Sequence, residues 1–185
     1  MKDINNSLQL WLEEITKYEL TAYENMPDID LYMDQMITYL ERILQPFALS
    51  TLDKQITSSM INNYVKGDCI PSPVSKRYNK EHIAQILEIC LLKRANNISD
   101  IKQILQASYT EDKIGETYNE FRTKAMTILH EISQNTATML TEIPTNDQNA
   151  LLNLALTLSL NANFNILIAN RIFDYIRIYN DLNKE

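Results

Sequence analysis

The middle of the chain carries side chains that have the chemistry to contact a nucleic acid. The segment 57–66 holds Asn62, Asn63 and Lys66. An asparagine amide can bond an adenine edge through two hydrogen bonds, and a lysine can bind a phosphate. A basic pair, Lys76 and Arg77, follows two prolines that restrict the backbone and remove amide donors. We expect this stiff arm to hold the pair against phosphates; the alternative is a rigid crossover with no ligand.

The distribution of charge supports the same segment. The whole chain has a net charge of −7, which by itself disfavours nucleic acid, but residues 54–106 carry a net charge of +4. The flanks, 1–53 and 107–185, carry −7 and −4. For nucleic-acid binding, a local basic patch matters more than the net charge of the whole chain. The candidate DNA-contacting residues are Lys54, Ser58, Asn62, Asn63, Lys66, Lys76, Arg77, Tyr78 and Lys80.

Catalysis and metal binding have little support in the sequence. It holds 2 histidines and 2 cysteines, and we find no glycine-rich phosphate loop, no metal-ligand spacing and no nucleophile motif. We therefore expect a protein that is not an enzyme and has no cofactor and no metal. Cys90 lies in an apolar segment and is expected in the core, whereas Cys69 lies in a turn, where a sensing thiol is the less favoured alternative.

These residues must be positioned by helices. With 2 glycines among 185 residues and 45% apolar residues, the sequence favours an all-α globular protein. Helical spacing of the apolar residues, together with candidate caps, predicts the boundaries. The predicted helices are 4–23, 31–44, 57–66, 80–95, 100–106, 111–140 and 146–182.

The last two predicted helices form a long hairpin. In the first, apolar residues recur with heptad-like spacing, which is typical of a seam within one chain or between two copies. In the second, residues 148–170 contain no charged residue. That length can span a bilayer, but polar residues recur every four positions, so a core or interface helix is favoured over a membrane helix. The seam residues are Ile114, Tyr118, Phe121, Ala125, Ile128 and Ile132.

The order of motifs in 57–105 resembles the DNA-binding core of mercury-resistance-type (MerR) regulators. The segment 61–64 resembles the end of their recognition helix, 70–73 the turn that follows, 76–78 the end of the basic wing, and 98–105 the closing helix. Asn62 stands where these regulators have an arginine, and the wing is several residues shorter. The resemblance implies a MerR-like helix-turn-helix core and dimerisation through a long C-terminal helix.

A closer resemblance, over about residues 10–108, is to an uncharacterised bacterial family known as domain of unknown function 1836. Its pattern is matched by 27–35, by 57–66, by the two prolines Pro71 and Pro73, and by Lys76, Tyr78, His82 and Ile83. This resemblance implies the same helix-turn-helix core but no established activity.

Together these observations predict a fold and a function. We expect a MerR-like helical DNA-binding domain at 1–108 that includes N-terminal helices, followed by a helical hairpin at 109–185 for dimerisation or effector binding. The predicted function is a transcription regulator that reads the major groove of DNA with the helix 57–66. The alternative is a helical protein-interaction or adaptor module that keeps the fold without binding DNA. The expected partners are DNA, a second copy through the C-terminal helices and an unspecified small-molecule effector, with no membrane. Without an apolar leader, we expect a cytoplasmic location.

Overall fold

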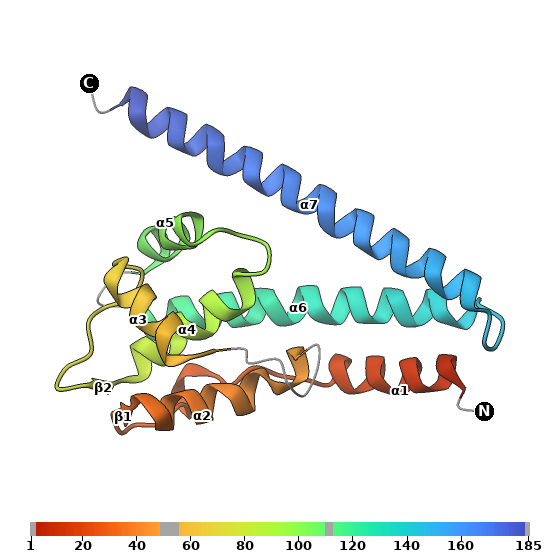
Figure 1. The fold of residues 1–185 in the computed structure, drawn as a ribbon, viewed down its shortest axis with the longest axis horizontal. Helices are drawn as coiled ribbons and strands as arrows, with labels where there is room; N and C mark the ends of the chain where they lie inside the picture. Colours follow the sequence, from red (N-terminus) through yellow and green to blue (C-terminus); the bar gives the residue numbers. More distant parts are fainter. Residues whose placement is uncertain (1–2, 49–55, 110–112, 184–185) are drawn as a thin grey trace. The chain divides into compact units, whose positions relative to one another are not determined.

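The computed structural model describes residues 3–48, 56–109 and 113–183 (Figure 1). These residues are mostly helical, which confirms the all-α prediction. The chain divides into two compact units, 18–128 and 1–17 with 129–185, which we call the central unit and the terminal unit. This division differs from the predicted boundary after residue 108, because helix α6 (Ile114–Thr141) begins in the central unit, where Tyr118 is completely buried.

The described residues of the central unit form six helices and strands before α6, and two short 3-10 turns. They are η1 (Tyr23–Asn25), β1 (Leu31–Tyr32), α2 (Met33–Leu44), η2 (Gln45–Phe47), α3 (Ser58–Lys66), β2 (Arg77–Tyr78), α4 (Lys80–Leu92) and α5 (Ile98–Ser108). The two strands pair in antiparallel fashion, with Leu31 opposite Tyr78 and Tyr32 opposite Arg77. The sequence did not reveal β1, because a two-residue strand has no detectable periodicity.

Helix α4 is the centre of the central unit. Every residue from His82 to Cys90 is buried, and α4 packs against α2, α5 and β2. A helix that is buried on all sides must be surrounded by its own chain or by a partner, and here its own chain surrounds it. The core residues around it include Met36, Leu40, Ile61, Ile101, Leu105 and Tyr118.

Local hydrogen bonds explain where α4 begins. The Asn79 side chain accepts from the His82 backbone N–H at 3.2 Å, and the His82 ring accepts from the Asn79 N–H at 3.1 Å. This reciprocal cap matches the predicted start at Lys80. The helix ends at Leu92, earlier than the predicted Ala95, because the Lys93 N–H still bonds the Ile89 carbonyl but the next residues turn away.

The terminal unit consists of α1 (Ile4–Thr16), the C-terminal part of α6 and α7 (Gln148–Leu182). The start of α1 is joined to the turn between α6 and α7 by amide hydrogen bonds. The Ile4 N–H donates to Asn146 Oδ1 and the Asn146 N–H donates to Asn5 Oδ1, both at 3.1 Å. The predicted helix 4–23 is shorter than expected, since α1 ends at Thr16.

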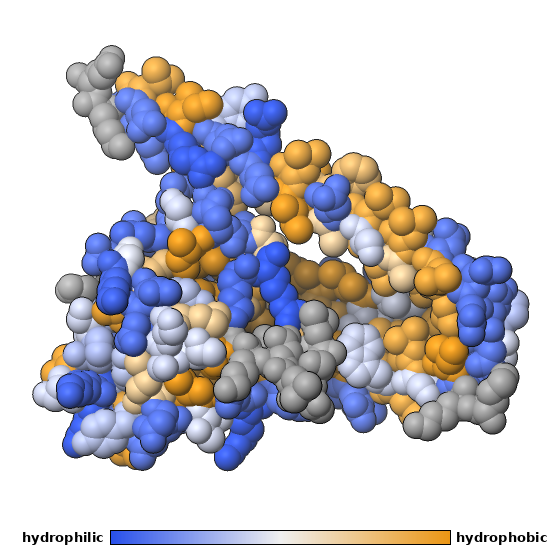
Figure 2. All heavy atoms as spheres, in the orientation of Figure 1, coloured by the Kyte–Doolittle hydropathy of each residue, from blue (hydrophilic) through white to orange (hydrophobic). Residues whose placement is uncertain are grey.

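Helix α7 is 35 residues long, and none of its described residues is buried. Leu151, Leu154 and Leu158 are half-buried, whereas most other apolar side chains of α7 are exposed. Figure 2 shows apolar surface gathered along this helix. By length and composition, α7 is the one helix among the described residues that could cross a membrane. The expectation that it is a core helix is wrong for the isolated chain.

Candidate nucleic-acid interface

Helix α3 presents one buried face and one polar face. The Thr57 side chain caps it by accepting from the Met60 N–H at 3.3 Å. Ile61 and Tyr64 are buried where α3 packs against α2. The exposed residues, Ser58, Ser59, Asn62, Asn63 and Lys66, recur at helical spacing and form a stripe on the other side. The structure thus brings four of the nine candidate residues (Ser58, Asn62, Asn63 and Lys66) onto one exposed face.

The C-terminus of α3 is closed by a Schellman motif. The Cys69 N–H donates to the Tyr64 carbonyl at 2.8 Å, and the Asp68 N–H donates to the Val65 carbonyl at 3.0 Å. Asp68 has a φ of 52°, whereas Gly67 has a φ of −85°. The left-handed residue is therefore the aspartate and not the glycine that precedes it. Aspartate is one of the few residues that tolerate this conformation without help.

The segment after α3 ends in a tight hairpin. The Arg77 N–H donates to the Val74 carbonyl at 2.9 Å, and the two residues between them, Ser75 and Lys76, have φ values of 51° and 63°. Two consecutive residues with positive φ are characteristic of the type I′ turn, whose twist suits antiparallel strands. Lys76 is therefore exposed at the tip of a turn, and the proline-stiffened arm expected from the sequence ends before it.

Arg77 is oriented by the strand pair. Its Nη2 donates to the Tyr32 hydroxyl at 3.1 Å, and its guanidinium carbon lies 5.0 Å from the centre of the Tyr32 ring. Both residues are exposed, so the arginine keeps donors free for a ligand while the ring restricts its motion. Figure 1 shows α3 and β2 at the same end of the central unit.

Two of the predicted DNA contacts are engaged with other residues of the protein. Tyr78 is 3% exposed, and its ring packs edge-on against His82 with centroids 5.3 Å apart. Lys80 forms an ion pair with Asp28 and lies 5.8 Å from the centre of the Tyr23 ring. Pairing of β2 with β1 turns the Tyr78 side chain into the core, which the pattern of polar and apolar residues around position 78 could not reveal. Lys54 lies outside the described residues.

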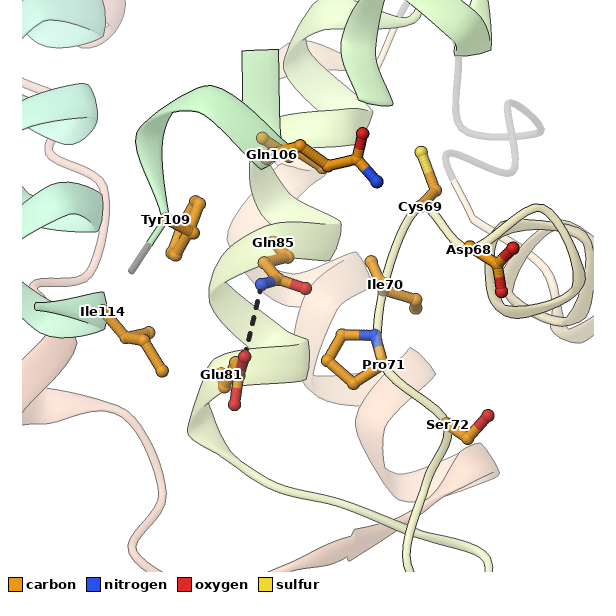
Figure 3. A pocket seen from close by; sticks show the side chains of 11 residues that line it. Asp68, Cys69, Ile70, Pro71, Ser72, Glu81, Gln85, Gln106, Tyr109 and Ile114 are labelled. Carbon is orange, nitrogen blue, oxygen red and sulfur yellow. Dashed lines mark hydrogen bonds between the residues drawn. The ribbon is translucent and has the colours of Figure 1, made fainter. Parts of the chain in front are cut away.

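A pocket of about 410 Å³ lies behind the turn that follows α3. Its walls are that turn, α4, α5 and the start of α6 (Figure 3). Gln85 donates to Glu81 Oε1 at 3.4 Å, but its own amide oxygen has no partner among the described residues, although Gln85 is only 6% exposed. A buried acceptor without a donor costs stability unless a ligand or water supplies one.

Beside this pocket lies a buried carboxyl group. Glu88 is 2% exposed and accepts a hydrogen bond from the Tyr109 hydroxyl. Burial raises the pKa of Glu88 to about 7, and the tyrosine hydrogen bond lowers it only in part. The sequence did not single out Glu88, because a glutamate in an amphipathic pattern is normally a surface residue.

The two cysteines are buried. Burial raises the pKa of the Cys69 thiol, and it raises that of Cys90 to about 11. Reactive thiols need a lowered pKa and access to solvent, so neither cysteine has the surroundings of a redox sensor. Within residues 3–48, 56–109 and 113–183, no cluster of three or more histidine, cysteine or acidic side chains could hold a metal ion.

Comparison with known proteins gives one match. The family described as "Domain of unknown function (DUF1836)" matches residues 21–121, more than half of the chain. The chain belongs to this family. The DUF1836 region contains α2 to α5 and the first part of α6, so it includes α3, the hairpin and the pocket but not α7. Curated proteins and solved structures gave no match.

Sequence reasoning also missed residues that support the candidate surface formed by α3 and the hairpin. Tyr32 orients Arg77, and the Lys102 ammonium group donates to the Gly67 carbonyl at 2.8 Å at the end of α3. Val74, beside the hairpin tip, is 74% exposed. Lys102 lies in the segment 98–105 that resembles the closing helix of the MerR-like pattern. Tyr32 lies within the segment 27–35 that matches the DUF1836 pattern, but its contact with Arg77 could not be foreseen, because the two residues are 45 positions apart.

Proposed function

We propose that this protein is a DNA-binding transcription regulator of MerR-like type, in which α3 enters the major groove. The observation that carries the proposal is the exposed polar stripe on α3, with Asn62 and Asn63 beside each other and Lys66 one turn later. Asparagine amides would bond adenine edges, and the lysine would bind a phosphate. A helix of nine residues, about 13 Å long, fits within the groove.

The hairpin supplies the second part of the proposed surface. Lys76 and Arg77 are exposed on a tight turn joined to α3, so they would contact the backbone next to the groove. The net charge of +4 over residues 54–106 favours an approach of this region to DNA, whereas both flanks are acidic. In this proposal Tyr78 and Lys80 keep the hairpin in place rather than touch DNA.

The alternative function is a helical protein-interaction or adaptor module that has kept the fold without DNA binding. The net charge of −7 favours it, as does Asn62 in place of the arginine that MerR regulators use. The two functions differ in one measurable property. A DNA complex loses affinity steeply as salt rises, because cations condensed on the phosphates are released on binding.

The test begins with selection of bound DNA from a random pool, followed by fluorescence anisotropy titrations from about 50 to 200 mM salt. The variant Lys76→Ala with Arg77→Ala should reduce the slope of log affinity against log salt by about 2 and weaken binding to all sequences alike. The variant Asn62→Ala with Asn63→Ala should relax the sequence preference at a few positions, at about 1–3 kcal/mol per base pair read.

The matched control is Lys113→Ala with Lys124→Ala, which removes the same charge from two exposed lysines near α6. It should leave the salt slope unchanged. No selectable DNA at low salt would favour the adaptor function. Selected DNA whose salt slope is equal in the wild type and in the hairpin variant would refute the role of Lys76 and Arg77.

We also propose the pocket behind the α3 turn as the place for a small-molecule effector. The buried Gln85 amide oxygen would accept a hydrogen bond from the ligand, and apolar walls at Ile70 and Leu105 would contact its body. Because Asp68 and Cys69 belong both to the pocket and to the end of α3, an occupied pocket would alter the position of the helix.

A further inference from the structure

Helix α7 exposes more apolar side chains than a monomeric protein normally tolerates. Twelve large hydrophobic residues between Leu152 and Leu182 are more than two-fifths exposed. Side chains of this size each bury roughly 60–120 Å² of apolar surface, so the total is on the order of 1,000 Å². Contiguous apolar patches on monomers are normally no larger than about 300–600 Å². This surface needs a cover.

Part of the exposed surface is organised as a seam. Leu152, Leu156, Leu160, Asn163 and Leu167 are all exposed, and with 3.6 residues per turn they lie within an arc of about 80° on one side of the helix. We call these five residues the leucine seam. The half-buried Leu151, Leu154 and Leu158 lie on the opposite side. The helix therefore has one face for its own chain and a second face that is open.

We propose that the leucine seam pairs with the same seam of a second copy of this chain, with the two α7 helices parallel and in register. Three observations favour a second copy as the occupant: the charge of the helix, the position of its one polar seam residue and the available area. The proposal concerns association alone and does not depend on DNA binding.

Charge is the first observation. Two copies with a net charge of −7 repel one another over most of their surface, but residues 148–170 contain no charged side chain. Two seams can therefore meet across a two-fold axis without placing like charges opposite each other. A partner selected by charge would have nothing to recognise along this stretch.

The position of Asn163 sets the direction of pairing. In a parallel, in-register pair, Asn163 of each copy lies opposite Asn163 of the other, and the two amides can hydrogen-bond. In an antiparallel pair centred on Leu160, position 163 of each copy falls opposite position 157 of the other, so the two Asn163 amides do not meet. A single polar residue in an apolar seam fixes register and number of strands in this way.

The seam leucines supply part of the area that a dimer needs. A stable interface buries about 800 Å² on each partner; four leucines at roughly 60–120 Å² each give about 240–480 Å², and exposed neighbours such as Phe164 and Ile178 would add to it.

A bilayer is a poor occupant of this surface. A lipid bilayer would have to surround the uncharged stretch, which contains six asparagines. Each amide without a partner in hydrocarbon costs several kcal/mol, whereas exposed asparagines beside a dimer seam remain in water.

The position of this surface differs from the seam expected on α6. Tyr118, near the start of the heptad-like pattern, is completely buried and donates to the Thr21 carbonyl at 3.0 Å. That part of the pattern packs within the central unit. Ile128 and Ile132 are about half exposed, but they make up only two positions. The longer apolar surface is on α7.

The test measures the mass of the full chain by sedimentation velocity over about 0.1–100 μM, a range that brackets micromolar dissociation constants. We expect a dimer of about 43 kDa, twice the 21.5 kDa of one chain. Leu156→Glu with Leu160→Glu should raise the dissociation constant at least about 100-fold, because the seam would bury charges without partners. Far-UV circular dichroism of each variant reports whether the helices are retained.

The matched control is Asn161→Glu with Asn165→Glu, which adds the same two charges at the same spacing but on the other side of α7. It should remain dimeric. A second variant, Asn163→Cys, should form a disulfide-linked dimer on mild oxidation, since Cys69 and Cys90 are buried. A wild-type chain that is monomeric throughout the range would overturn the proposal, as would a dimeric seam variant or a control that dissociates equally.

A vesicle flotation assay with phosphatidylcholine and phosphatidylglycerol tests the alternative that a membrane, and not a second copy, contacts the seam. The dimer should stay with the unbound protein. Flotation of wild-type chain that is monomeric in solution, abolished in the Leu156→Glu, Leu160→Glu variant, would assign the seam to a membrane and overturn the proposal. Loss of DNA binding in an otherwise dimeric protein would affect the proposed function alone.

Discussion

Helices α4 and α7 are both rich in apolar residues, but they are covered very differently. In α4 nine consecutive residues are buried, including the polar His82, Gln85 and Glu88. In α7, which is almost three times as long, no described residue is buried. The comparison shows that the apolar side chains of a helix must be shielded from water, but the sequence of the helix does not specify whether its own chain or a partner shields them. For α4 the cover is the DUF1836 region itself, and for α7 we propose a second copy.

The largest effect is expected from a pair of leucine-to-alanine changes, one in each helix. Leu87 in α4 is completely buried, whereas Leu152 in α7 is 68% exposed. We expect Leu87→Ala to lower the free energy of unfolding by about 2–5 kcal/mol through the cavity it leaves. Leu152→Ala should change it by less than about 0.5 kcal/mol when measured at concentrations where the chain is monomeric. Urea denaturation provides both values, and an equal loss at Leu152 would mean that α7 is covered by its own chain.

The second test concerns the buried carboxyl group of α4. Because the pKa of Glu88 is raised from 4.5 to about 7 in the folded protein, the folded state binds its proton more tightly than the unfolded state does. The stabilisation that protonated Glu88 gives to the folded state is fully present below pH 4.5 and is lost as the pH rises to about 7. The loss amounts to about 3 kcal/mol at most.

Glu88→Gln should therefore flatten the fall in unfolding free energy between pH 4.5 and 7, while keeping an acceptor for the Tyr109 hydroxyl. Urea denaturation at a series of pH values measures the slope. The same change at the exposed Glu120 serves as a control and should leave the profile as in the wild type. An unaltered slope in Glu88→Gln would mean that Glu88 is not buried as described.

The smallest expected effect distinguishes the polar residues of the two helices. Gln85→Leu removes a buried amide oxygen that has no partner among the described residues, so it should raise the unfolding free energy by about 1 kcal/mol. The matched change Asn163→Leu on the exposed seam should leave the stability of the monomer unaltered. Thermal and urea unfolding can measure the difference. A loss of stability in Gln85→Leu would show that water or a ligand satisfies this oxygen.

The sequence predicted helix type and order well, because the apolar spacing and caps are local. Asn79 identified the start of α4, and the uncharged stretch identified α7. Boundaries that depend on distant contacts were missed. Tyr78 was expected at the surface, but its burial is decided by pairing with Leu31, more than forty residues earlier.

The backbone conformation of the turns also could not be predicted from the sequence. The left-handed residue at the end of α3 is Asp68 and not Gly67, and Ser75 and Lys76 adopt this conformation without any glycine or asparagine. Non-glycine residues in this region are uncommon, so residue type gave no warning. The exposed polar face of α3 therefore follows from helical spacing in the sequence, whereas the course of the hairpin does not.

The contact between Tyr32 and Arg77 has a consequence for the history of the family. The two residues are 45 positions apart, yet one side chain orients the other. A change of the tyrosine to a residue without a ring or hydroxyl would leave the arginine unrestrained, and a change of the arginine would leave the ring without its cation. Positions 32 and 77 should therefore vary together among DUF1836 sequences, as residues in spatial contact tend to do.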